Sequence, residues 1–367
     1  MPVKNYESLN TTTDVTTTKT LLHEAIPVTG TIMSGVYGNW TSETNVKNYT
    51  HGMWQSQFDY PYLSSSANHI FDITMGFDES STMSGSLNAV QQSKKINIYN
   101  QFSQVLLGYT GSTNTVRLFE NDLVLDASAA NLMKDGYFLS FSRLLTKDQI
   151  KKGSVNLKIG TGSWADPFAS TGGSILTLQD VSASSADSGI QDTVGGQYGL
   201  LYEANGDGTY GKGAGAGVYG LVFYQAGIVV VTGSIFSSSA QFFSKSHSDG
   251  GGYYEFADSF VSQSISGNCD ALRHRLYNIS FNNTTEINST IYFCRVPHNK
   301  YNYSSNPTYT SGSKIQVKNV ASDNPVSYIT TIGLYSSNNE LLATAKLSEP
   351  LRKDPTNDIT LRVRLDY

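Results

Sequence analysis

The sequence predicts a mainly β fold with a minor helical part, built as antiparallel sandwich or meander domains. Composition is the first reason, because charged residues make up 15% of the chain against about 25% in an ordinary soluble domain. The second is that tyrosine supplies 23 of the 367 residues and glycine 33, which is typical of strands and turns. The third is the alternation of apolar and polar residues, which is cleanest in 359–367.

Helical signals are confined to the N-terminal part, 1–160, which we therefore expect to be an α+β region. A helix is expected over 95–107, with Gly108 as its stop, because one apolar set recurs there at helical spacing: Ile98, Phe102, Val105 and Leu106. A shorter helix is expected over 146–152, which begins with a Thr-x-x-Gln capping box and is followed by Gly153.

The middle part, 161–267, is dominated by glycine, serine, alanine and aspartate. Short alternating runs lie between polar stretches such as 182–188 and 205–217. A high glycine content raises the entropy that is lost on folding, so order here has to come from packing against the rest of the chain or a partner. We expect a β-rich insertion with long surface loops.

The C-terminal part, 268–367, is the most regular. Five strands with turn-forming residues between them are expected: 276–281, 287–293, 327–335, 340–347 and 359–367. The hairpin over 327–347 and the strand over 358–367 are expected to form a three-stranded antiparallel meander, whose edge can pair with another subunit.

Membrane insertion and secretion are not expected. The first 22 residues are polar and threonine-rich, without the basic and apolar segments of a secretory signal. The longest apolar run, 220–231, is shorter than the roughly 20 residues that cross a bilayer. Cys269 and Cys294 are too few for a disulfide framework. Two buried thiols are the expected state, with pairing across a hairpin left open.

Signals for chemistry are weak. A net charge of −5 argues against nucleic acid as a partner. The glycines at 211–220 precede an expected strand rather than a helix, so no nucleotide cofactor is expected. No two of the six histidines lie three or four residues apart as zinc ligands often do, and His274 between two arginines indicates an anion-facing surface or interface anchor. We expect no metal, no catalytic residues and no enzymatic activity.

Two aromatic segments, 51–62 and 297–309, carry the strongest functional signal. They combine tyrosine and asparagine with proline and few charges, which suits ordered loops and matches the composition of interface cores. The residues expected at interfaces are Trp54, Phe58, Tyr60, Tyr62, Tyr301, Tyr303, Tyr309, Tyr335 and Tyr367. Packing within the chain is the alternative for all of them. Contact with a sugar is a second alternative for 60–63, which lies between Asp59 and Asp72.

The C-terminal sequence resembles a hairpin of virion proteins of tailed phages. Residues 328–335 and 338–350 match the pattern I-G-L-Y, turn, E-L-L-A-x-A-K-L of baseplate and fibre-attachment proteins. Four other stretches are similar to a structural protein of marine contractile-tailed phages of the cyanophage type: 22–27, 60–73, 141–153 and 361–367. The resemblance covers the first and third parts and leaves out the middle part. It implies a virion component and brings no catalytic residues.

The expected function is a non-enzymatic structural subunit of a contractile tail, in or near the baseplate. Its place would be the virion, after assembly in the host cytoplasm. Expected partners are other virion structural proteins and further copies of the chain in a symmetric assembly. A neck or collar protein stays open, as does a receptor-binding protein that holds a host surface glycan with the middle part as its tip. A tail-embedded depolymerase is least favoured, because the sequence has no internal repeat.

Overall fold

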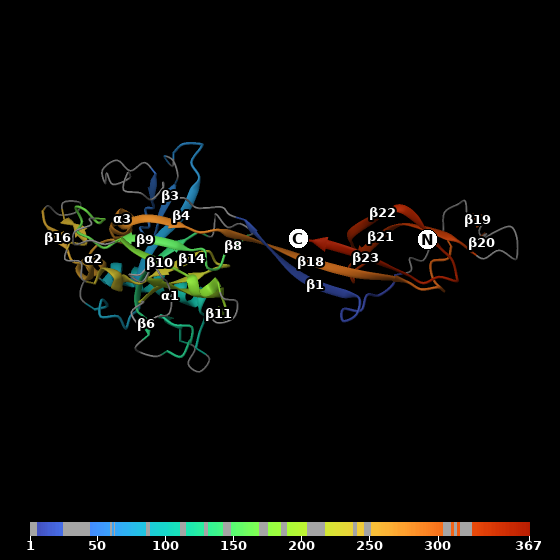
Figure 1. Ribbon diagram of the computed structural model, residues 1–367, viewed down its shortest axis with the longest axis horizontal. Helices are drawn as coiled ribbons and strands as arrows, with labels where there is room; N and C mark the ends of the chain where they lie inside the picture. The colour runs from blue at the N-terminus through green and yellow to red at the C-terminus, as the bar shows by residue number, and fades with distance from the viewer. Residues whose placement is uncertain are drawn as a thin grey trace. The chain divides into compact units, whose positions relative to one another are not determined.

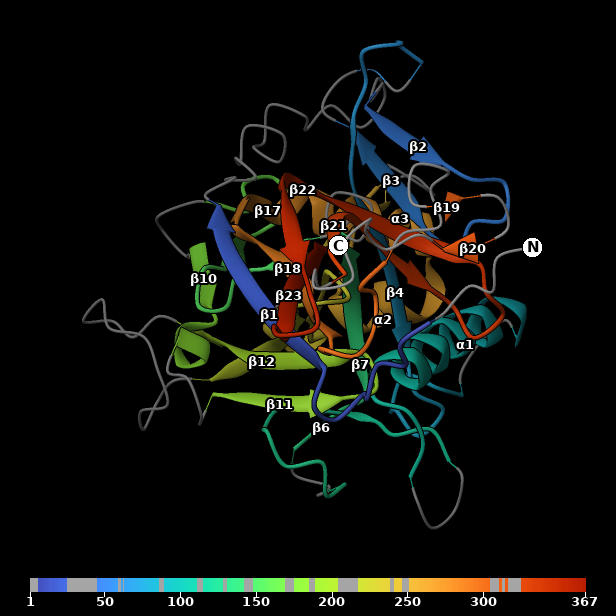
Figure 2. The same cartoon turned by 90° about the vertical axis from the view of Figure 1, so that its right-hand side faces the viewer.

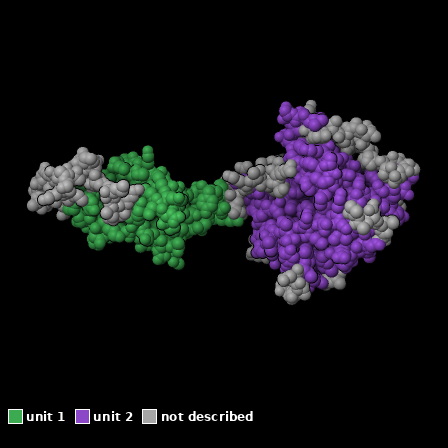
Figure 3. Space-filling model, turned by 180° about the vertical axis from the view of Figure 1, so that it is seen from behind, with its two compact units in different colours: residues 1–21, 286–367 green, residues 22–285 purple. Residues whose placement is uncertain are grey.

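The computed structural model confirms a mainly β protein, with 46% of the described residues in strands and 16% in helices; Figure 1 labels the elements. Two compact units are present (Figure 3): unit 1 is Met1–Leu21 with Glu286–Tyr367, and unit 2 is Leu22–Thr285. The residues described are 6–24, 45–58, 61, 63–85, 89–110, 115–127, 131–141, 148–168, 175–184, 189–203, 217–237, 241–245, 251–303, 310–311, 314–315 and 325–367.

The main feature of unit 2 is an antiparallel sheet that holds eleven strands in its described residues. Their spatial order is β17 (Leu276–Ser280), β9 (Asn156–Gly160), β10 (Ile175–Gln179), β12 (Gly196–Glu203), β13 (Val218–Phe223), β14 (Ile228–Val231), β7 (Asp135–Ser140), β4 (His69–Phe77), β3 (Gln55–Phe58) and β2 (Val46–Asn48). The eleventh strand, β11 (Ile190–Thr193), pairs with β12. The central strands are buried along most of their length, which is why they are rich in valine, leucine and aromatic residues.

Helices cover both faces of this sheet. Helix α1 (Ala89–Leu106) lies along β4 (Figure 2), and its Phe102 ring stacks on Phe138 at 4.3 Å. Helices α2 (Phe256–Ser262) and α3 (Ile265–Arg275) pack on the other face, where Phe260 contacts Tyr137 with ring centroids 5.3 Å apart. Residues 137 and 138 are neighbours on β7 and point to opposite faces, so the two contacts lie on opposite sides of the sheet.

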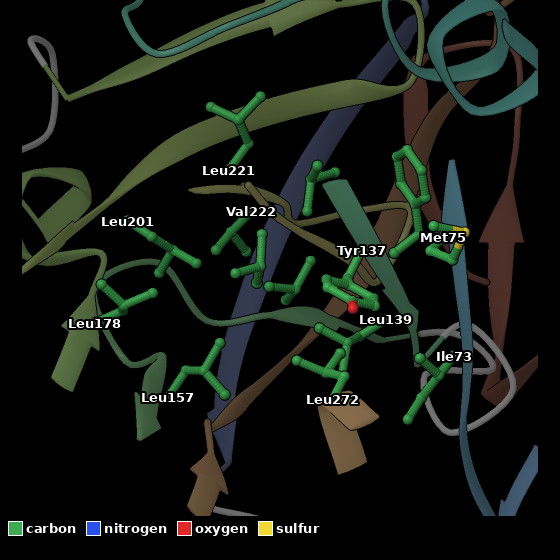
Figure 4. Close-up of a cluster of buried hydrophobic side chains, with 14 of the residues drawn as sticks. Ile73, Met75, Tyr137, Leu139, Leu157, Leu178, Leu201, Leu221, Val222 and Leu272 are labelled. Atoms are coloured by element: carbon green, nitrogen blue, oxygen red, sulfur yellow. The ribbon is translucent and has the colours of Figure 1, made fainter. Parts of the chain in front are cut away.

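The core between the sheet and α3 is dense and apolar (Figure 4). Side chains from six strands and from the helix meet there: Ile73, Met75, Tyr137, Leu139, Leu157, Leu178, Leu201, Val222 and Leu272. Leu221, also labelled, points to the other face of the sheet, and all ten side chains are at most 1% exposed. Short elements complete unit 2: β5 (Phe119–Glu120), β6 (Leu132–Met133), β8 (Asp148–Ile150), β15 (Phe243–Ser244), β16 (Tyr253–Tyr254) and the 3-10 turns η3 (Val181–Ser184) and η4 (Gly233–Phe236).

The described residues of unit 1 form strands, turns and loops and contain no helix. Strand β18 (Asn283–Val296) pairs with both β1 (Val15–Glu24) and β23 (Ile359–Asp366). Strands β21 (Ser327–Tyr335) and β22 (Leu341–Lys353) form a separate hairpin, and β19 (Thr310–Ser311) pairs with β20 (Lys314–Ile315). The alternation expected over 359–367 is observed, because less exposed and exposed residues alternate along β23.

The expected helix over 95–107 is present as α1, which begins at Ala89. The expected helix over 146–152 is wrong, since Asp148–Ile150 is β8 and pairs with the first residues of β18. The Asp148 carboxylate accepts hydrogen bonds from Asn283 Nδ2 at 2.6 Å and Thr285 Oγ1 at 2.7 Å. A long-range strand pairing thus outweighs the local capping signal; residues 142–147 lie outside the described part.

The expected C-terminal meander is also wrong, because β23 pairs with β18 and not with β22. Residues 161–267 are more than an insertion: β12, β13 and β14 lie in the middle of the unit 2 sheet. The expected boundaries at 160 and 267 therefore differ from the two units, since β10 and β17 both pair with β9 across them. Cys269 lies in α3 and Cys294 in β18, both as free thiols.

Candidate assembly interface

Hydrophobic side chains are buried very differently in the two units. Unit 2 has one large core, whereas Val363 is the one buried hydrophobic side chain among the described residues of unit 1. Eight large hydrophobic side chains of that described part are exposed instead: Tyr6, Tyr303, Tyr328, Tyr335, Leu341, Leu342, Leu351 and Tyr367. The candidate interface of this chain is therefore the exposed apolar surface of unit 1.

The β21–β22 hairpin carries five of these eight side chains. Its turn, 336–339, closes because the Ser336 amide donates to the Glu340 carbonyl at 2.9 Å and Asn339 takes a left-handed conformation with φ +64°. In its outer part, half-buried side chains gather on one face: Ile332, Leu334, Ala343, Ala345 and Leu347. The opposite face there carries Tyr335 and Leu341, with exposed fractions of 40% and 53%, and Tyr328, beyond the shift in register, is 58% exposed.

Polar contacts hold the base of the hairpin. The Lys353 side chain is fully buried, and its Nζ donates to Asn302 Oδ1 at 2.8 Å and to the backbone carbonyls of Asp354 at 2.7 Å and His298 at 3.3 Å. The Ser327 hydroxyl, opposite Lys353 in the ladder, donates to the Tyr301 carbonyl. Unit 1 thus gains order from hydrogen bonds where it has little apolar burial.

The predicted interface residues of unit 1 differ in exposure. Tyr303 is 50% exposed and Tyr367 73%, while Tyr301 is half-buried and has φ +57°. Tyr335 contacts Tyr6 edge-to-face with ring centroids 5.1 Å apart. Tyr309 lies outside the described residues. The Tyr301 ring is therefore only partly at the surface. The exposed tyrosines lie in the loop at 303, in the hairpin and at the end of β23.

The other predicted interface residues belong to the edge of the unit 2 sheet. Trp54 precedes β3 and is 37% exposed, and Phe58 is half-buried; Tyr60 and Tyr62 lie outside the described residues. Trp54 belongs to an aromatic edge cluster, in which His51 lies 4.2 Å from Trp54 and 5.2 Å from Tyr49 between ring centroids. The Lys47 ammonium lies 4.8 Å from the centre of the Tyr49 ring.

Beside this cluster, Asp72 accepts hydrogen bonds from Ser56 and from the His69 imidazole, whose Nε2 is 2.7 Å from Oδ1. Serine, aspartate and histidine therefore meet, but the carboxylate lies between the other two. A nucleophilic serine needs a histidine as its immediate proton acceptor. The arrangement orients the side chains and does not activate Ser56.

Two buried ionic groups escaped the sequence analysis. In the cluster around His274, Arg273 meets the Asp270 carboxylate at 2.9 Å, whereas Arg275 meets backbone carbonyls. Burial lowers the pKa of Arg275 to about 10, and its guanidinium donates to the carbonyls of Gly162, Gln241 and Phe242 at 2.6, 3.0 and 3.1 Å. Asp180 is buried too. Desolvation raises its pKa to about 6, although it accepts hydrogen bonds from the backbone and Tyr224. Neither residue type signals burial in a sequence.

No group of three or more His, Cys, Asp or Glu side chains that could hold a metal ion occurs among the described residues. None of the helices described there is long and apolar enough to cross a membrane. His274 Nε2 donates to the Trp164 carbonyl, 2.8 Å away, and burial lowers the pKa of His274. No protein family model, curated protein or solved structure matches the chain.

Proposed function

We propose that this chain is a non-enzymatic structural subunit of a tailed-phage virion, most specifically of the tail near the baseplate. The observation that carries the proposal is the near absence of buried hydrophobic side chains among the described residues of unit 1, beside eight exposed ones. A structural subunit needs such a surface because its neighbours cover it permanently. The resemblance of 328–350 to hairpins of virion proteins points to the same unit.

The energetics favour permanent rather than transient contacts. Full burial of one large apolar side chain contributes roughly 1.5–3 kcal/mol, so even partial burial of the exposed set supports a stable interface. Interfaces that form once and remain are the more hydrophobic class. The two units also differ in formal charge. Unit 1 has 11 basic and 9 acidic residues and a charge of +2, and unit 2 has 14 basic and 21 acidic residues and a charge of −7.

A second candidate function is glycan binding by the aromatic edge cluster of unit 2. At the sheet edge His51 stacks on Tyr49, and the Trp54 ring contacts both at a tilt while keeping 37% of its surface exposed. Exposed rings beside amide and hydroxyl groups can contact the apolar face of a sugar while the polar groups take its hydroxyls. This candidate places the ligand site in unit 2 and leaves unit 1 for assembly.

The test is the location of the chain in an infected culture. Particles of a phage that carries this gene are purified by density gradient, and their proteins are quantified by mass spectrometry. We expect the chain in a fixed copy number per particle and its loss from particles when the gene ends after Lys353. A chain found only outside particles contradicts the proposal. A glycan array with the full chain and a Trp54→Ala variant tests the second candidate separately.

A further inference from the structure

The two outer edges of the β21–β22 hairpin have very different chemistry. Strand β22 carries the exposed residues Lys346, Glu349, Pro350 and Arg352, and its ladder with β21 is interrupted at 347–350. Charges, proline and bulges are what proteins use to keep an edge strand from pairing with another chain. Strand β21 has neither charge nor proline in its nine residues, and isoleucine, threonine and tyrosine dominate it.

Strand β21 has a described partner strand on one side only. Among the described residues it pairs with β22 alone, in a sheet of two strands. An isolated two-stranded hairpin is marginally stable in water, whereas three or more strands with an apolar face are stable. The hairpin has such a face, formed by its half-buried side chains, and no third strand joins it among the described residues.

We propose that β21 docks β21 of a second copy of this chain, with residues 331–335 of the two copies paired antiparallel about Gly333. In this register Thr331 lies opposite Tyr335 of the other copy, and Ile332 opposite Leu334. Thr331 and Tyr335 are both on the exposed face, and Ile332 and Leu334 are both on the half-buried face. Side chains of like exposure therefore meet across the new pair, as a continuous sheet requires.

The absence of charge selects a copy rather than a different protein. A strand that pairs with itself places each of its charges near its own duplicate, so any charge at or near the twofold axis repels. A strand for an unrelated partner commonly carries charges that match that partner and repel others. The strand 327–335 carries none.

The small number of buried hydrophobic side chains in the described part of unit 1 points to the same partner. A unit with one buried hydrophobic side chain among its described residues needs a partner whenever the chain folds. A second copy of the chain is available wherever the chain is made, whereas another protein has to be produced at the same place and time. Self-association of this kind is a property of the purified chain and does not rest on the proposed virion function.

A cysteine pair tests the contact. In the full chain carrying Thr331→Cys and Tyr335→Cys, oxidation is expected to join two copies, because side chains opposite in a ladder have Cβ atoms about 5 Å apart. A bond within one copy is excluded, since positions 331 and 335 are about 13 Å apart along a strand. Each single variant and the unchanged chain with Cys269 and Cys294 are the controls. Sedimentation is expected to give a dimer or a larger even-numbered assembly, and a monomer at micromolar concentration overturns the proposal.

A charge swap tests the register. Thr331→Glu with Tyr335→Glu places carboxylates opposite each other at two points, whereas Thr331→Glu with Tyr335→Lys places opposite charges there. Both variants lose the same contact with Tyr6. We expect the Glu/Glu variant to dissociate roughly tenfold more readily than the Glu/Lys variant at low salt, with a smaller difference at high salt. Equal dissociation constants overturn the register, and Ser348→Glu on β22 is expected to leave association unchanged.

Discussion

Unit 2 and unit 1 are both β-rich, yet they are stabilised by different means. Unit 2 surrounds a single apolar core with helices on both faces of its sheet, and even its buried Arg275 and Asp180 have hydrogen-bond partners. The described residues of unit 1 bury one hydrophobic side chain and expose eight large ones, and the Lys353 side chain is buried there among its hydrogen-bond acceptors. The comparison teaches that one chain can combine a unit with a large apolar core and a unit held mainly by strand pairing and polar contacts. The predictions below test this difference, from the largest expected effect to the smallest.

Removing the buried guanidinium of unit 2 is expected to be the most damaging single change. Arg275→Met keeps the volume but leaves the carbonyls of Gly162, Gln241 and Phe242 without donors, which costs roughly 3–5 kcal/mol. Urea denaturation followed by tryptophan fluorescence measures the loss. Arg275→Lys retains one cationic donor and is expected to lose less; equal losses for both variants would count against the hydrogen-bond explanation.

A matched pair of leucines separates the units. Leu272→Ala in α3 empties a site that is 0% exposed and is expected to cost about 2–5 kcal/mol of unfolding free energy. Leu342→Ala in β22, 68% exposed, is expected to change it by less than about 0.5 kcal/mol in monomeric chains. The same urea titration reads both. A large cost for Leu342→Ala in a monomer would show that unit 1 has a core of its own.

The units are expected to respond to pH in opposite directions. Burial raises the pKa of Asp180 in unit 2 to about 6, so its folded form favours the proton, and the stability due to this group is lost as the pH rises from about 4 to 6. The expected loss is roughly 2–3 kcal/mol. Hydrogen bonds lower the pKa of Asp354 and of Asp366 in unit 1, so their contribution is instead lost as the pH falls.

Asp180→Asn separates this response from that of other groups. Denaturation of the wild type and the variant at pH 4.5, 5.5 and 6.5 gives the pH dependence of each. We expect the variant to lose the decline between about pH 4 and pH 6, even though it is less stable overall because an amide cannot accept both backbone N–H groups of Gly153 and Val155. Parallel curves would contradict the assignment.

The smallest effect concerns the base of the hairpin. Lys353→Met removes donors to Asn302 and to two backbone carbonyls and is expected to cost about 2 kcal/mol, confined to unit 1. Hydrogen exchange, read peptide by peptide, shows which unit loses protection. Lys346→Met, an exposed lysine of the same strand, is the control. Equal loss of protection in unit 2 peptides would mean that the units do not fold separately.

Local patterns predicted much of this fold. The spacing of Ile98, Phe102 and Leu106 predicted α1, and the alternation of β23 predicted its strand. Helices α2 and α3 were missed because they are short and polar, although Ser264 accepts from the Gly267 amide as an N-cap. The order of the strands in the sheet was not predictable. Strand β9 pairs with β10, which is near it in the sequence, and also with β17, which follows more than 100 residues later.

The candidate interface was predicted only in part. Tyrosine content and low charge indicated exposed aromatic side chains, and Tyr303, Tyr335 and Tyr367 are exposed. Composition could not show how few hydrophobic side chains the described residues of unit 1 bury, because residues 343–347 alternate as in any half-buried strand. Whether such a strand is covered depends on its neighbours in space.

The way that unit 1 draws on both ends of the chain affects the timing of its synthesis. Strand β1 leaves the ribosome early, but the strand beside it in the sheet, β18, follows more than 250 residues later, with β21 and β23 behind it. At about 5–20 residues per second, unit 2 can fold before that partner exists. Strand β21 thus emerges after all of unit 2 has been synthesised, so unit 2 can already be folded when β21 first becomes able to pair with another chain.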